Sequence, residues 1–424
     1  MNLKKADPKI FNLIKKEIQR QKEGLVLIPS ENYASPAVFK AMGTPLSNKY
    51  SEGYPRKRYY GGNEFIDEIE QTAIERAKKI FKAEHANVQP HSGSQANAAV
   101  YLALLNYRDK ILGIDLSAGG HLTHGSKVNF SGKLYQFAYY GVNPKTEKVD
   151  LKEVEKIALR FKPKLIIVST TAYSRTLNFK GFRKIANKVK AYLMADIAHI
   201  AGLVVTGFHP HPFPWCDVVT TTTHKTLRGP RGGLILSKIK DRLDPKGKFN
   251  LAQKIDKAVF PGTQGGPLDH VIAAKAVCFL EAMKPDFKKY QKQIILNARA
   301  MADEFIKQGI RVVSGGTDNH LMVIDVSPFG DSSKKIQDEL DEVGIYVNRN
   351  AIHFDKRPPY DPSGIRLGSP AITTRGLKER ESREVVRLIV KLIKNINNAQ
   401  IKNQIKKRVE EIVKKFPIYY DFQW

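Results

Sequence analysis

At residues 217–233 the chain reads DVVTTTTHKTLRGPRGG, and this stretch carries the strongest signal for the fold. Its β-branched run, Val218–Thr222, predicts a buried strand. The strand leads into His224 and Lys225, which precede a turn rich in Gly, Pro and Arg. A lysine at the end of a buried strand can approach a ligand carbonyl and, once burial and nearby cations remove its proton, form a Schiff base. The alternative is an ordinary solvated lysine, of which this chain has many.

On both sides of this segment, short apolar runs alternate with amphipathic helical stretches. Such alternation predicts an α/β domain whose sheet is mostly parallel and covered by helices on both faces. The ligand of such a sheet is expected at the carboxyl ends of its strands. The expected strands are 110–114, 134–139, 165–169, 192–195, 218–222 and 234–236, and helices are expected at 96–105, 151–161 and 182–189.

The flanking regions predict a second, smaller domain and an N-terminal arm. Asp7 and Pro8 are suited to start a helix, which would place Ile10, Phe11, Ile14 and Ile18 on one face. A length of 424 residues favours two domains, here expected as an arm at 1–24, a large domain at 25–285 and a small α+β domain at 286–424. Further expected elements are an irregular section at 25–63, helices at 64–81, 267–308 and 377–416, and strands at 311–313, 321–325 and 345–348.

The charge balance is strongly basic, with 70 Lys and Arg against 42 Asp and Glu and a formal net charge of +28. Clustered cations would indicate nucleic-acid binding, whereas dispersed ones indicate a lysine-rich surface. The basic residues are spread along the whole chain, and no basic run is interleaved with aromatic residues. Nucleic acid is therefore not expected as the main partner, although anionic small molecules would be attracted.

Cysteine usage and hydropathy limit the compartment. Cys216 and Cys278 belong to no CxxC or His/Cys cluster, which argues against a disulfide scaffold and a thiolate zinc site. The most apolar stretch, 191–208, is interrupted by Asp196 and His199, so no membrane span is expected. The first residues lack the apolar core of an export signal. The sequence thus predicts a soluble protein of the cytoplasm.

Two further residues, Asp196 and His199, could contact the ring of a ligand bound at Lys225. Asp196 ends an apolar strand, where a carboxylate can pair with a protonated ring nitrogen and keep a pyridinium electron-poor. The alternative is an Asp that caps the following turn. His199, three residues on, can hydrogen-bond ring substituents or pack as a core histidine.

Two loops complete the pattern. Ser92, Gly93 and Ser94 lie at the predicted start of a helix, where hydroxyls and backbone N–H groups bind phosphate or merely cap the helix. The loop GGHLTHG at 119–125 holds two histidines, but no carboxylate or thiolate lies at ligand spacing, so a stacked imidazole fits better than a metal and no metal site is expected. Amine, carboxylate, phosphate site and stacking histidine together predict a pyridoxal 5′-phosphate site.

With these motifs the chain resembles serine hydroxymethyltransferases, which are pyridoxal-phosphate enzymes of fold type I. The similarity runs almost end to end and keeps the family's order. It rests on LIPSENYAS (27–35), NKYSEGYPRKRYYGG (48–62), NVQPHSGSQAN (87–97), GGHLTHGSKVNFSGKLY (119–135), ADIAHIAGLV (195–204), TTTTHKTLRGPRGG (220–233), VFPGTQGGP (259–267), VSGGTDNHL (313–321) and SGIRLGSPAITTRG (363–376).

The resemblance implies roles for individual residues. Lys225 would hold the cofactor covalently, Asp196 would pair with its pyridine nitrogen, and His121 would stack on its ring. The phosphate would be bound by Ser92, Gly93 and Ser94 together with Gly262 of the partner subunit. Thr171 and His199 would lie near the phenolic oxygen. Around the substrates, Arg366 and Ser30 would bind the amino-acid carboxylate, Glu52, Tyr50 and Tyr60 would come from the neighbouring subunit, and Leu116, Gly120, Leu122 and Asn350 would contact the pterin.

The implied reaction cleaves the Cα–Cβ bond of serine and passes the carbon to a reduced pterin, leaving glycine, in an obligate homodimer with shared sites. Glu52 is the implied proton-transfer acid. Thr171 stands where the family often has Ser, and residues 350–362 depart from the family's pattern. The lysine-rich composition resembles archaeal members, so the carrier is expected to be tetrahydrofolate or tetrahydromethanopterin. Two alternatives are a pterin-independent aldolase of β-hydroxy amino acids and a basic nucleic-acid-binding protein on the same scaffold.

Overall fold

The computed structural model describes residues 2–330 and 332–419, which form two compact units. The sheet unit comprises Asn32–Lys292 and Asp318–His320, and the terminal unit combines the N-terminal segment up to Glu31 with Gln293–Thr317 and the chain from Leu321 onward. These limits differ from the predicted boundaries after 24 and 285. Residues 25–31 join the terminal unit because β1 (Leu25–Val26) pairs in parallel with β12 (Ile345–Tyr346).

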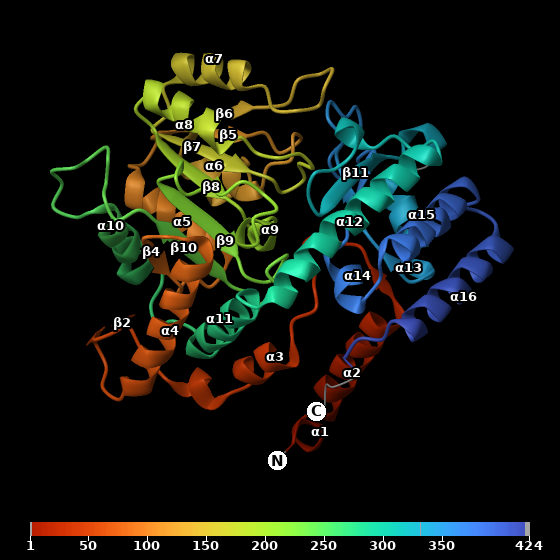
Figure 1. The fold of residues 1–424 in the computed structure, drawn as a ribbon, viewed down its shortest axis with the longest axis horizontal. Helices are drawn as coiled ribbons and strands as arrows, with labels where there is room; N and C mark the ends of the chain where they lie inside the picture. Colours follow the sequence, from red (N-terminus) through yellow and green to blue (C-terminus); the bar gives the residue numbers. More distant parts are fainter. Residues whose placement is uncertain (1, 331, 420–424) are drawn as a thin grey trace. The chain divides into compact units, whose positions relative to one another are not determined.

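The sheet unit is built on a seven-stranded sheet with the order β4-β10-β9-β8-β7-β5-β6 (Figure 1). Strand β10 runs antiparallel to both of its neighbours, whereas β9, β8, β7, β5 and β6 are mutually parallel, so the predicted α/β fold with a mostly parallel sheet is confirmed. The strands are β4 (His85–Asn87), β5 (Lys110–Ile114), β6 (Gln136–Tyr140), β7 (Leu165–Ser169), β8 (Tyr192–Asp196), β9 (Val218–Thr222) and β10 (Gly233–Ser237).

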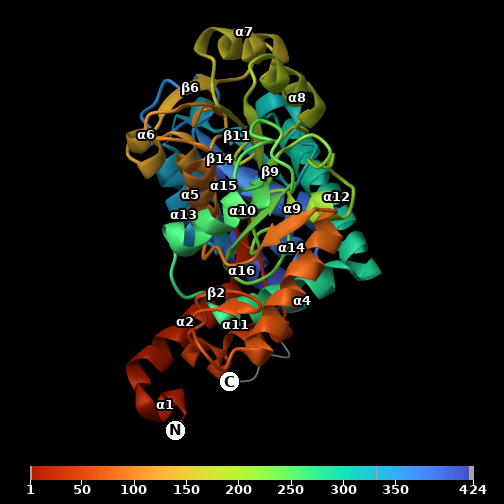
Figure 2. The same cartoon turned by 90° about the vertical axis from the view of Figure 1, so that its left-hand side faces the viewer.

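Helices α4 and α11 of this unit lie side by side, as Figure 1 and Figure 2 both show. Helix α4 has the predicted limits, while α5 begins at Gly93 rather than at Ala96 because Ser92 caps it. The helices are α3 (Pro36–Met42), α4 (Glu64–Phe81), α5 (Gly93–Leu104), α6 (Phe130–Leu134), α7 (Leu151–Phe161), α8 (Phe179–Lys188), α9 (Ala201–Val205), α10 (Leu251–Lys257), which continues into a helical turn (Ala258–Thr263), and α11 (Asp269–Ala282).

Two expectations for this unit need correction. The helical section expected at 267–308 is two helices, α11 and α12 (Pro285–Lys307), because Pro285 cannot continue a helix and is suited to begin one. The section at 25–63 is not wholly irregular. It contains α3 and a small hairpin formed by β2 (Gly53–Tyr54) and β3 (Lys57–Arg58).

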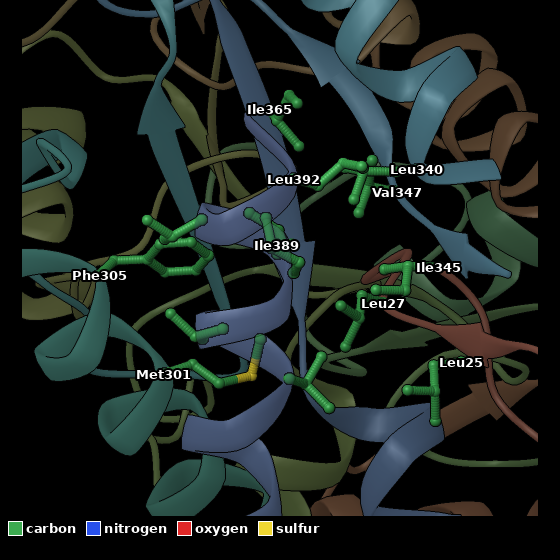
Figure 3. Packing of buried hydrophobic residues seen from close by; sticks show 14 of the residues in the cluster. Leu25, Leu27, Met301, Phe305, Leu340, Ile345, Val347, Ile365, Ile389 and Leu392 are labelled. Atoms are coloured by element: carbon green, nitrogen blue, oxygen red, sulfur yellow. The ribbon is translucent and has the colours of Figure 1, made fainter. Parts of the chain in front are cut away.

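The terminal unit contains a three-stranded antiparallel sheet with the order β11-β14-β13, as an α+β domain requires. Buried side chains from α12, α13, α15 and the strands form its core (Figure 3), in which Met301, Phe305 and Ile389 are fully buried. Its elements are α1 (Leu3–Ala6), α2 (Pro8–Glu23), β1, β11 (Leu321–Asp325), α13 (Ser333–Glu342), β12, β13 (Asn348–Asn350), β14 (Gly364–Gly368), α14 (Pro370–Arg375), α15 (Glu379–Lys394) and α16 (Ala399–Lys415).

Two sequence expectations for the terminal unit are tested directly. Asp7 caps α2 and Pro8 begins it, as predicted, but no residue of this helix is buried within the chain. The strand expected at 311–313 is absent: Val312 makes only an isolated bridge to Ile324, and Ser314 adopts a left-handed conformation (φ 59°) in a turn that ends at Gly315 and Gly316. Over the described residues, no helix has both the length and the apolar character that crossing a membrane requires.

Candidate active site

The site forms at the carboxyl ends of β7, β8 and β9, where a parallel sheet places its ligands. Asp196 is the last residue of β8, opposite Ser169 of β7 on one side and Thr220 of β9 on the other. The loops that follow these strands carry Thr171, His199 and Lys225. The sheet therefore brings these predicted residues to one edge.

Asp196 is a buried carboxylate that the fold keeps ionised. Asn97 Nδ2 lies 2.9 Å and His124 Nε2 lies 3.2 Å from its Oδ2, and the backbone N–H of Ala198 donates to Oδ1 at 3.1 Å. Burial by itself would raise the pKa of Asp196, but the hydrogen bonds from His124 and Asn97 outweigh it and hold the pKa well below its usual range. An acceptor of this kind can keep a proton on a ligand's ring nitrogen.

Sequence reasoning assigned no role to Asn97 and His124. Asn97 also donates to the Thr123 hydroxyl at 2.9 Å and accepts from the Thr220 hydroxyl at 2.7 Å, so its amide is held from both sides. Both residues lie inside quoted motifs, Asn97 at the end of QPHSGSQAN and His124 as the second histidine of GGHLTHG. Their position in those motifs was the available signal.

His121 is held by the same network. Its Nδ1 lies 2.8 Å from the Thr123 hydroxyl, and its backbone N–H donates to His124 Nδ1 at 3.1 Å. The loop that carries it is tightly packed, since a Cβ on Gly120 would lie 2.5 Å from the carbonyl oxygen of Ile114. The side chains of Leu116 and Leu122, on the same loop, are about half exposed.

Lys225 is half-buried in the loop after β9. Its ammonium donates to the Thr222 hydroxyl at 2.9 Å, and that hydroxyl lies 3.4 Å from the carbonyl oxygen of Ala198, the residue whose N–H binds Asp196. Its own carbonyl accepts the side-chain amide of Asn32 at 2.9 Å, which fixes the backbone at this point. Both groups are thus anchored to the backbone of Ala198: its N–H binds Asp196, and its carbonyl oxygen accepts the hydroxyl of Thr222, which in turn accepts from Lys225.

Two further histidines, His199 and His224, lie in the loops after β8 and β9. Burial, together with the charges of Lys225 and Arg231, lowers the pKa of His224 to about 2, so its ring is neutral. His199 is buried, and its Nδ1 lies 3.2 Å from Nε2 of His320, with the two rings stacked. No cluster of three or more His, Cys, Asp or Glu that could hold a metal occurs among the described residues.

The N-terminus of α5 is built for close approach. Ser92 caps the helix by accepting the N–H of Gln95 at 3.2 Å. A Cβ on Gly93 would lie 2.7 Å from the methyl group of Thr222, and one on Gly233 would lie 2.3 Å from the carbonyl oxygen of Ser92. The backbone here therefore has no room for larger residues, while Ser94 is exposed at the helix start, an arrangement suited to a phosphate.

Glu52, Tyr50 and Tyr60 form a second cluster on the sheet unit. The tyrosine rings meet edge to face at 5.1 Å, and the charge of Glu52 raises the pKa of Tyr60. Glycines before α11 leave space for them, because a Cβ on Gly265 would lie 3.0 Å from Glu52 Oε1. Both tyrosines are about half exposed. Gly262, in the helical turn that precedes Gly265, is exposed and packs beside Leu102 of α5.

Three predicted residues belong to the terminal unit. Arg366 lies in the middle of β14, paired with Val323 and Asn348, and its Nε donates to Asn348 Oδ1 at 3.2 Å. Burial lowers the pKa of Arg366 to about 10, so it is still charged at neutral pH. Asn350 ends β13, and Ser30 follows β1.

A family model described as serine hydroxymethyltransferase matches residues 3–389 of the chain.

Proposed function

Because the chain belongs to the serine hydroxymethyltransferase family, whose members interconvert serine and glycine on pyridoxal phosphate with transfer of a one-carbon unit, we propose which of its residues and which carrier serve that reaction. The proposal rests on one observation above all. A buried carboxylate with a depressed pKa, Asp196, is linked through Ala198 and Thr222 to the amine of Lys225.

The residues present fit pyridoxal phosphate. Asp196 Oδ1 accepts a hydrogen bond from the backbone N–H of Ala198, and the depressed pKa keeps the carboxylate ionised. A protonated pyridine nitrogen requires an ionised acceptor of this kind. The close-packed start of α5 offers backbone N–H groups to a phosphate. When bound, the cofactor supplies an electron sink for the bond that is cleaved at the amino acid's Cα.

The residues of the sheet unit would divide the work around the cofactor. Lys225 Nζ would hold the cofactor at its aldehyde carbon, and Asp196 would keep the proton on the ring nitrogen. His121, whose ring is held by the Thr123 hydroxyl, would stack on the ring. Ser92, Gly93 and Ser94 would bind the phosphate, and Thr171 and His199 would hydrogen-bond the phenolic oxygen.

Arg366 is the proposed clamp for the amino-acid carboxylate, with Ser30 beside it. A planar guanidinium can donate two parallel hydrogen bonds to a carboxylate, a geometry that an ammonium lacks. Its retained charge at neutral pH supports this role. The net charge of +28 further favours the approach of anionic substrates.

We propose a homodimer in which Glu52, Tyr50, Tyr60 and Gly262 of one subunit complete the site of the other. The exposure of both tyrosines and of Gly262 within one chain supports this, since it leaves them available to a second copy. Glu52 then serves as the proton-transfer group at the substrate hydroxyl or the pterin. The two buried free thiols, Cys216 and Cys278, fit action in the reducing cytoplasm.

The carrier is proposed to be a reduced pterin, with Leu116, Gly120, Leu122 and Asn350 as its contacts. The half-exposed Leu116 and Leu122 offer apolar surface to a flat ring. Serine cleavage by the purified holoenzyme is measured without pterin, with tetrahydrofolate and with tetrahydromethanopterin. Stimulation by one of them identifies the carrier, whereas equal rates in all three assays would favour a pterin-independent aldolase instead.

Replacing Glu52 by Gln is expected to slow pterin-dependent turnover by about 10²- to 10⁴-fold, the usual contribution of a positioned proton-transfer group. Serine binding, measured from the change in the cofactor's absorbance, is expected to change little because the carboxylate clamp is untouched. Glu68→Gln, an exposed carboxylate of α4, is the matched control and should be neutral. Full activity of Glu52→Gln would remove Glu52 from the mechanism.

A further inference from the structure

Lys275 of α11 is a fully buried lysine whose ammonium is bound by backbone alone. Its Nζ lies 2.6 Å from the carbonyl oxygen of Val88, 3.0 Å from that of Pro90 and 2.8 Å from that of Gly233. Three acceptors match the three hydrogens of an ammonium, whereas a neutral amine could satisfy only two of them. The side chain is 1% exposed.

Burying a lysine ammonium that has no carboxylate among its hydrogen-bond partners costs free energy, and this disfavours the protonated form. Burial lowers the pKa of Lys275 to about 7, and the charge of Glu70 counters part of that shift. Glu70 itself is engaged by Arg58 at 2.7 Å and by the side-chain amide of Gln89 at 2.8 Å. With a pKa of about 7 the amine is only partly protonated at neutral pH, and in its protonated form it is held by oriented carbonyl dipoles, as a bound monovalent cation would be.

The three carbonyls belong to the two segments that build the cofactor site. Val88 and Pro90 lead directly to Ser92 at the start of α5, while Gly233 ends the loop that carries Lys225. These segments also touch directly, because the N–H of Gly233 donates to the carbonyl of Pro90 at 3.0 Å. A Cβ on Gly232 would lie 2.6 Å from Lys275 Cε, so a larger residue there would displace the Lys275 side chain.

On its other side the segment before Ser92 is fixed by a glutamine. Gln264 accepts the backbone N–H of His91 at 3.0 Å and donates to the carbonyl of Gln89 at 3.0 Å. Lys275 and Gln264 thus hold residues 88–91 from two directions. Lys275 also reaches the loop that carries Lys225, through the carbonyl oxygen of Gly233.

We propose that Lys275 is a positioning residue that acts as a built-in cation, fixing the phosphate-binding start of α5 against the loop that carries Lys225. The inference rests on the proposed function, because it takes Ser92–Ser94 as the phosphate site. Lys275 itself touches neither cofactor nor substrate in this role. Its effect reaches the ligand through the backbone at 88–92, so it should act on phosphate binding more than on the ring.

The test compares two ligands in cofactor-free protein: pyridoxal phosphate and pyridoxal, which lacks the phosphate. Lys275→Met removes the donors at similar length and is expected to raise the Kd of pyridoxal phosphate about 10- to 100-fold, the scale of one or two lost charge-assisted hydrogen bonds. The Kd of pyridoxal should change by less than threefold. Lys275→Gln, which keeps two donors, is expected to fall between Met and the natural residue.

Val154→Ala is the control, because it removes buried methyl groups from α7, outside the segments named above. It should lower the melting temperature of the cofactor-free protein without changing either Kd. Equal weakening of both ligands by Lys275→Met, or no weakening of either, would overturn the inference. If Lys275→Met does not fold, the same comparison is made with Lys275→Gln. Failure of the unaltered protein to bind pyridoxal phosphate would instead overturn the proposed function.

Discussion

Lys225→Ala is expected to abolish covalent attachment of the cofactor and to reduce serine turnover by on the order of 10⁴- to 10⁶-fold, the scale of loss when one member of a catalytic triad is removed. The Nζ that the Thr222 hydroxyl holds at 2.9 Å is the only atom of this side chain able to bond to an aldehyde carbon. No other proposed residue supplies an amine at that position, so no residue can compensate for its loss.

The measurement is borohydride fixation of the cofactor followed by peptide mapping. In the unaltered protein the label should lie on the peptide that contains residue 225, and in Lys225→Ala no labelled peptide should remain. Lys240→Ala, which removes an exposed lysine beyond β10, is the control and should retain both the label and the activity. A label that persists on another lysine in the variant would contradict the assignment.

Asp196→Asn is expected to lower turnover by on the order of 10³-fold, a loss comparable to removal of one preorganised electrostatic group from an active site. The substitution keeps the shape but removes the charge. The new amide would also face two donors, Asn97 and His124, which now both point at Asp196 Oδ2. The ring nitrogen of the cofactor would thereby lose the anion that keeps it protonated.

Turnover and the visible absorbance of the bound cofactor are the two readouts for this variant. Absorbance is expected to shift because it reports the protonation of the ring, while borohydride should still fix the label on Lys225. Asp150→Asn is the control, since it neutralises the half-buried carboxylate that caps α7 and Asn is an equally good cap. Unchanged turnover in Asp196→Asn would show that the carboxylate only caps its turn.

Local sequence signals were sufficient for much of the fold. The limits of α4 follow from its apolar periodicity, and β7 and β9 follow from unbroken β-branched and apolar runs. The strand expected at 311–313 failed because the run is short and the following Gly315 and Gly316 favour a turn. The joining of residues 25–31 to the terminal unit could not be predicted locally, since it depends on pairing with residues far along the chain.

For the site, the sequence identified residues that the fold brings to one strand edge and missed those that support them. Asp196 and Lys225 stand at strand ends, where polar residues after apolar runs are conspicuous. Asn97 and His124 act through Asp196, and no spacing rule marks such a contact. Lys275 occurs in an otherwise apolar helix face, where its three carbonyl partners come from segments that only the folded chain brings together.

The pairing of β1 with β12 also has a consequence for how the protein is made. Leu25 and Ile345 are separated by about 320 residues, so at the usual elongation rate of 5–20 residues per second the ribosome needs roughly 16–64 s to supply the partner strand. During that interval the chain of the sheet unit is synthesised, whereas β1 has no partner strand and its side chains Leu25 and Val26, buried in the folded protein, stay uncovered. Chaperones that bind nascent chains would therefore find an uncovered apolar segment at β1 until Ile345 and Tyr346 have been made.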